Sequence, residues 1–79
     1  MKFETPSEIV QVDCYSGGRF AERPVSFVWR REKLQVAALK QAWHTPDGVA
    51  FLVRVPDSRH FELTYAVSSD QWTGRQVSL

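Results

Sequence analysis

Hydrophobic and polar residues alternate with a period of two along much of this chain. The alternation is clearest at 25–30, it is also seen at 9–15 and 60–67, and 49–55 and 71–77 are two further candidate strands. Successive side chains of a β-strand point to opposite faces, so this period predicts strands. At 49–55 both faces are fairly apolar, which is typical of a central strand.

Short turns separate these stretches and predict antiparallel pairing. The clearest turn is Thr45-Pro46-Asp47-Gly48, in which proline fixes φ, aspartate can hydrogen-bond its own backbone and glycine accepts a positive φ. The sequence Pro56-Asp57-Ser58 predicts a second turn of the same kind. Connections this short favour a meander of neighbouring strands.

One segment fits two structures. The stretch 32–43 is rich in good helix formers, and Val36, Leu39 and Trp43 would share one face of a helix. A bent strand fits as well if a bulge near 37–38 brings Leu39 and Trp43 onto one face. The hairpin-length connections on both sides favour the bent strand.

The pattern therefore predicts an all-β protein, an antiparallel meander of five to six strands curled into a small SH3-like barrel. The alternative is an α+β fold with a short helix at about 32–43. We expect one domain at 9–79, preceded by a loosely ordered segment at 1–8. A chain of 79 residues has room for a single small core.

Composition says more about the kind of protein and its cellular compartment than about its activity. Hydrophobic residues make up 43% and charged residues 24% of the chain, which is typical of a folded domain. Ten basic residues stand against nine acidic ones, with no polybasic run to favour a membrane surface. The single cysteine, Cys14, excludes an internal disulfide and fits a reducing compartment. With no signal peptide and no apolar run of about 18 residues, we expect a soluble cytoplasmic protein.

No pattern of residues indicates catalysis. His44 and His60 are the only histidines, and a metal site would need a third ligand such as Asp47. Asp47 and Asp57 lie in turns, where capping of the backbone explains them. A nucleophile elbow is also missing. We therefore expect neither an enzyme nor a bound cofactor or metal.

Arginine supplies the candidate binding chemistry. Its planar guanidinium suits phosphate or carboxylate groups, and neighbouring aromatic rings could stack on bases. An alternative is a solvated surface on which Glu22, Glu32, Glu62 and Asp70 balance the arginines. The candidate partner-binding residues are Arg19, Arg23, Arg30, Arg31, Arg54, Arg59, Tyr15 and Trp29.

The chain resembles a known family in the pattern of its core and turn residues. The chain between 10 and 72 is similar to short uncharacterised bacterial domains, which occur alone and at the C-terminal end of proteins similar to Y-family DNA polymerases. The resemblance implies the fold and an accessory role near DNA repair synthesis, and it brings no catalytic residues. It rests on Glu22-Arg23-Pro24, Leu34-x-Val36, Trp43, Pro46-Asp47-Gly48, Phe51-x-Val53, Phe61-x-Leu63-x-Tyr65 and Trp72.

These observations together favour a non-enzymatic binding module. We expect it to dock a protein partner or to bind single-stranded nucleic acid weakly through its arginine and aromatic residues. The alternative is a self-associating domain that pairs through an edge strand, either 9–15 or 71–77. Both a monomer and a homodimer are compatible with the sequence.

Overall fold

The computed structural model describes residues 1–14 and 23–79, and within them it contains strands and no helix. The strands are β1 (Lys2–Phe3), β2 (Glu8–Cys14), β3 (Pro24–Trp29), β4 (Glu32–Gln35), β5 (Ala38–Thr45), β6 (Gly48–Arg54), β7 (His60–Ala66) and β8 (Gln71–Ser78). All of the paired strands are antiparallel.

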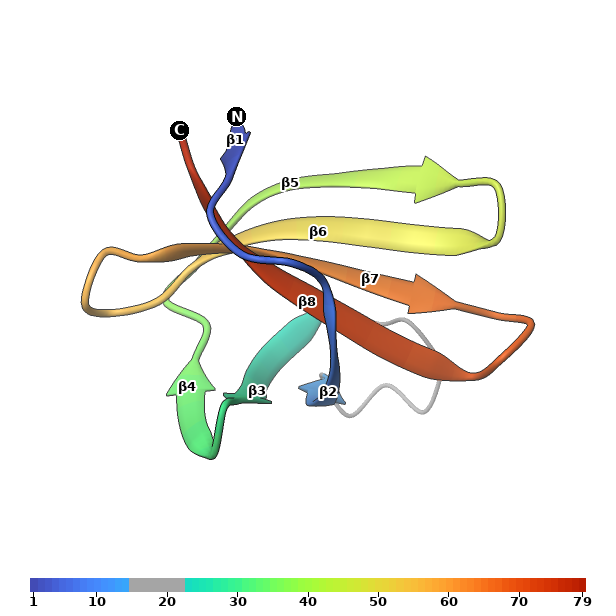
Figure 1. Ribbon diagram of the computed structural model, residues 1–79, viewed down its shortest axis with the longest axis horizontal. Coiled ribbons are helices and arrows are strands. Elements are labelled where there is room, and N and C mark those ends of the chain that lie inside the picture. The colour runs from blue at the N-terminus through green and yellow to red at the C-terminus, as the bar shows by residue number, and fades with distance from the viewer. Residues whose placement is uncertain (15–22) are drawn as a thin grey trace.

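The strands form one sheet in the order β4-β3-β2-β8-β7-β6-β5, with β1 added to β8. The sheet curls into a half-barrel, so the prediction of a small antiparallel all-β fold is confirmed (Figure 1). Within the described residues there are eight strands rather than five or six. The additional strands are β1 and the second half of the stretch expected to run unbroken from residue 34 to 45.

That stretch is extended, so the short helix considered for 32–43 is wrong. Its first half, β4, pairs with β3, and its second half, β5, pairs with β6. The chain crosses between the two at Val36 and Ala37. The N–H of Val36 donates to the carbonyl oxygen of Val25 (2.9 Å), and that of Ala37 donates to Arg54 (2.7 Å). The crossing therefore connects the two ends of the strand order.

A bulge in β5 changes which residues share a face. The register shifts between Leu39 and Gln41, which places Leu39 opposite Val53 and Trp43 opposite Ala50. Val53 and Ala50 lie on opposite faces of β6 because side chains alternate along a strand. The expectation that Leu39 and Trp43 share a face is wrong, because the bulge lies between them rather than before them.

The concave side of the sheet holds the hydrophobic core. Phe61 contacts two aromatic rings of β3 edge to face, with centroid distances of 5.1 Å to Phe27 and 5.2 Å to Trp29. Such pairs add about 0.5–1.5 kcal/mol beyond the area that they bury. The cluster of buried residues comprises Val10, Phe27, Trp29, Leu34, Phe51, Val53, Val55, Phe61 and Leu63.

The first residues of the chain, expected to be loosely ordered at 1–8, make contacts with β8. Beyond the pairing of β1 with β8, the N–H of Glu4 donates to the carbonyl oxygen of Gln76 (2.8 Å). The N–H of Gln76 donates to Oγ1 of Thr5 (3.0 Å). The guanidinium of Arg75 lies over the ring of Phe3, 3.3 Å from its centroid.

The turn between β5 and β6 is joined to the turn between β7 and β8. The carboxylate of Asp47 accepts hydrogen bonds from the N–H (3.2 Å) and Oγ (2.6 Å) of Ser68, and the N–H of Val67 donates to the Asp47 carbonyl oxygen (2.7 Å). Gly48 does not have the positive φ expected of it. A Cβ there would instead overlap the carbonyl oxygen of Tyr65, so the glycine is needed for close approach of two strands.

Candidate functional site

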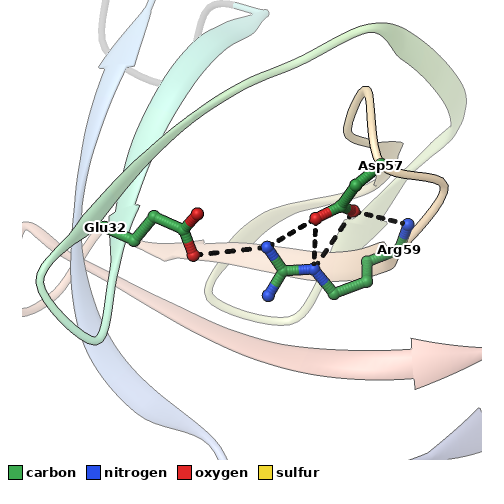
Figure 2. A network of polar contacts seen from close by, with 3 residues as sticks. All are labelled: Glu32, Asp57 and Arg59. Atoms are coloured by element: carbon green, nitrogen blue, oxygen red, sulfur yellow. Dashed lines mark hydrogen bonds and ion pairs between the residues drawn. The ribbon is translucent and has the colours of Figure 1, made fainter.

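Three of the predicted arginines lie at one end of the molecule. Arg30 and Arg31 form the turn between β3 and β4, and Arg59 lies in the turn between β6 and β7. Glu32 joins the two turns, because its Oε1 lies 3.3 Å from Nη2 of Arg59 (Figure 2). Arg54 ends β6 on the way into the second of these turns.

Arg59 is the centre of a polar network within this end. Its Nε and Nη2 lie 2.9 Å and 2.8 Å from Oδ2 of Asp57, and its N–H donates to Oδ1 (3.1 Å) (Figure 2). The guanidinium also lies over the ring of Phe61. The hydrogen bonds that Arg59 donates to the Asp57 carboxylate hold the pKa of Asp57 below its ordinary value and raise the pKa of Arg59. The side chain that was expected to bind a partner therefore holds two turns together.

Arg30 and Arg75 are held in a similar way. Nε and Nη2 of Arg30 donate to Oε2 of Glu8 (2.8 and 2.6 Å), and its guanidinium lies 4.8 Å from the ring centroid of Trp29. Nε of Arg75 donates to Oε1 of Glu62 (2.8 Å), a carboxylate that is only 9% exposed. Each guanidinium thus lies between a carboxylate and an aromatic ring, which leaves little uncompensated charge for phosphate.

Trp29 is in the core rather than on a binding face. It is 3% exposed and packs against Phe61, so the expectation that its ring is available for stacking is wrong. The reason is its register, because it follows Phe27 by two residues and so points to the same, concave side. Arg23 is exposed just before β3, whereas Tyr15 and Arg19 lie outside the described residues.

The Arg30–Arg31 turn has an unusual backbone. Their φ angles are 48° and 71°, as in the two-residue turn whose central positions favour Asn-Gly. A residue with a Cβ pays about 1–2 kcal/mol for this conformation. The contacts of Arg30 with Glu8 and Trp29 offset part of that cost, whereas the side chain of Arg31 is exposed.

A different surface stands out in the structure, the outer edge of β5. The strand order places β2 and β8 inside the sheet, so the expectation of an edge at 9–15 or 71–77 is wrong. Among the described strands, β4 and β5 stand at the two ends of the strand order. β4 has four residues and carries Glu32 and Lys33, whereas β5 has eight residues and one charged side chain, Lys40. Figure 1 shows β5 along the upper rim of the sheet, with β6 on one side only.

The register shows which backbone groups of β5 face outward. Thr45 pairs with Gly48 across a two-residue turn, and such a closing pair is hydrogen-bonded. Hydrogen-bonded pairs alternate along an antiparallel ladder, so Trp43 also bonds to β6. The N–H and C=O groups of Ala42 and His44 consequently point to the open side of β5, where no other described strand pairs with them.

An apolar groove adjoins the start of β5. It has a volume of about 220 Å³ and lies between the beginning of β3 and the crossing from β4 to β5. Val25 and Leu39, which are 38% and 39% exposed, lie on its two sides. We call β5 together with this groove the docking edge. The groove is lined by Arg23, Pro24, Val25, Val36, Ala37, Ala38 and Leu39.

The docking edge is cationic. Between residues 34 and 56 the basic residues are Lys40 and Arg54, and the single acidic residue, Asp47, bonds to Ser68. No ion pair of the described residues involves Lys40 or Arg54. The scarcity of acidic residues between 34 and 56 is visible in the sequence, but only the strand order shows that β5 lies at an edge.

Two further features are absent from residues 1–14 and 23–79. Neither His44 and His60 with Asp47 nor any other group of three potential ligands gathers as a metal site would require. In the same residues no helix is long and apolar enough to cross a membrane.

Comparison with known proteins adds no relative. Family models, curated proteins and solved structures were all searched, and none of them matches this chain. The resemblance to short bacterial domains stays a prediction.

Proposed function

We propose that this protein is a non-enzymatic binding module that docks a protein partner by taking an extended segment of it as an added strand beside β5. One observation carries the proposal: β5 is an eight-residue edge strand whose outward backbone groups meet no other described strand. Strand addition is a common mode of peptide recognition, in which the backbone supplies affinity and pockets beside it supply specificity.

The docking edge offers both of these contributions. Ala42 and His44 each present a donor and an acceptor, and a backbone hydrogen bond contributes about 0.5–1.5 kcal/mol net. An apolar side chain buried in the groove would add about 1.5–3 kcal/mol. After the cost of association, these terms correspond to a weak, reversible complex. Such a complex suits the accessory role near DNA repair synthesis that the resemblance implies.

The compartment and the fold type of the proposed module are the ones predicted from the sequence. We place the module in the cytoplasm, where Cys14 stays reduced. Its fold is of SH3-like kind, which the crossing at Val36 and Ala37 supports, because one bent chain segment pairs with strands at both ends of the sheet.

Binding of single-stranded nucleic acid has weaker support, since Arg30 and Arg59 are paired with carboxylates and Trp29 is buried.

Selection of displayed random peptides against the protein tests the proposal. The matched variants are Ala42→Pro, which removes an outward N–H of β5, and Lys33→Pro, which makes the same change on the other edge strand, β4. We expect selected peptides to bind the parent protein and Lys33→Pro but not Ala42→Pro. Circular dichroism and thermal melting must show that both variants are folded. Peptides that bind Ala42→Pro as well as the parent protein would refute strand addition at β5.

The second candidate, self-association, uses the same edge. Two copies could pair their β5 strands about a two-fold axis, which the open groups of Ala42 and His44 permit. Sedimentation of the parent protein and of Ala42→Pro over a wide concentration range tests this. A dimer that Ala42→Pro dissociates would support it, and a monomer at all concentrations would exclude it.

A further inference from the structure

The docking edge has chemical properties that select its partner, and the inference drawn from them rests on the proposed function. Over β5 itself the only charged side chain is Lys40, which lies at the bulge between Leu39 and Gln41. Arg54 is placed opposite Ala38, the first residue of β5. Both cations lie beside the end of β5 that adjoins the groove, and neither has a carboxylate partner among the described residues.

A strand added to β5 would alternate its side chains between two environments. On the outer face its neighbours would be Gln41 and Trp43, and on the concave face they would be Ala42 and His44. Towards the start of β5, the added strand would reach the groove between Val25 and Leu39, which has room for one apolar side chain. An acidic residue near that point would lie close to Lys40, with the charge of Arg54 one strand further away on β6.

We propose that the docking edge takes an extended, acidic segment of a partner protein, which adds as a strand beside β5 and places one apolar side chain in the groove. Charge complementarity selects this occupant. A second copy of the chain would offer no charge complement, because its own β5 carries Lys40 and no acidic residue. A nucleic acid would satisfy the cations but would leave the outward groups of Ala42 and His44 without a strand to pair with.

The peptides enriched in the selection described above provide the probe. We expect them to carry more Asp and Glu than Lys and Arg, with one apolar residue whose replacement by Ser weakens binding most. The enriched peptide is then titrated into Lys40→Glu and into Lys2→Glu, a matched charge reversal on β1. Lys40→Glu should weaken binding roughly five- to tenfold at low salt, an effect that shrinks as salt is added, whereas Lys2→Glu should not weaken it.

The outcomes separate this inference from the proposed function. If Ala42→Pro abolishes peptide binding but the peptides show no acidic preference and Lys40→Glu has no effect, docking at β5 stands and the acidic partner is wrong. If Ala42→Pro has no effect, or no peptide is enriched, both the acidic partner and the docking at β5 fail.

If a twelve-residue oligothymidine displaces the peptide from the parent protein and binds Lys40→Glu more weakly, the edge binds nucleic acid instead. Amide shifts at Ala42 and His44 on peptide addition give a check in the unmodified protein.

Discussion

At the scale of single residues, the surroundings of each arginine decide what it can do. Arg30, Arg59 and Arg75 are held between a carboxylate and a ring, and they stabilise turns or the first strand. Arg31 lies at the same end of the molecule as Arg30 and Arg59 but has no such contact among the described residues. It keeps a left-handed backbone at φ 71°.

Replacing Arg31 with glycine should stabilise the protein. Glycine adopts a positive φ at no steric cost, so Arg31→Gly should raise the free energy of unfolding by about 0.5–1 kcal/mol after the entropy that glycine adds to the unfolded chain. The melting temperature should rise by roughly 2–8 °C. Gln35→Gly, in the extended strand β4, is the control and should lower it. A fall in the melting temperature of Arg31→Gly would show that the side chain stabilises the turn by more than its backbone costs.

The carboxyl group of Asp57 should titrate below its ordinary pKa of about 3.9, because Arg59 hydrogen-bonds to its charged form. A lowered pKa in the folded state gives a stabilisation that is present above the unfolded pKa and is lost as pH falls through the folded one. Carboxyl ¹³C shifts measured against pH would give this value. Arg59→Gln should raise it, and an unchanged midpoint in that variant would contradict the role given to Arg59.

Residue identity alone could not separate these roles. The two-residue spacing of Phe27 and Trp29 along one strand is sufficient to predict that they share a face, and burial of Trp29 follows once Phe27 is in the core. The partner of Arg30 is a different case, because Glu8 is 22 residues away in the sequence and meets Arg30 only through the pairing of β2 with β3. Local sequence carries no signal for such contacts.

At the scale of elements, the sequence predicted five of the strands closely and misjudged the sixth. Period-two alternation locates β2, β3, β6, β7 and β8 because each of them has a core-facing side. The stretch that forms β4 and β5 is bent at Val36 and Ala37, and β5 is largely exposed, so its hydrophobic pattern does not follow one buried face.

The two glycines within strands should respond differently to replacement by alanine. A Cβ at Gly48 would overlap the backbone of Tyr65, whereas one at Gly74 would lie 3.1 Å from Cδ2 of Leu63 and 3.4 Å from Val10, side chains that can shift. We expect Gly48→Ala to lower the free energy of unfolding by roughly 2–3 kcal/mol. Gly74→Ala should change it by less than about 1 kcal/mol, because alanine also reduces unfolded-state entropy. Urea denaturation of both variants provides the comparison, and equal losses would contradict it.

At the scale of the whole molecule, the pairing of β8 with β2 decides which strands become edges. It joins the last strand to an early one, so β2 and β8 lie inside the sheet and β1 pairs with β8. A reading of neighbours along the chain predicts the hairpins but not this long-range pair. The candidate site depends on the same pairing, because β5 is identified as an edge strand only once the strand order is known.

The most direct test of the account is amide hydrogen exchange along β5 in the unbound protein. If β5 is an open edge, the amides of Ala42 and His44 should exchange at least about tenfold faster than those of Trp43 and Thr45, which bond to β6. Ala42 and His44 amides that are protected as well as those of Trp43 and Thr45 would mean that another part of the molecule covers the edge, and would contradict docking there.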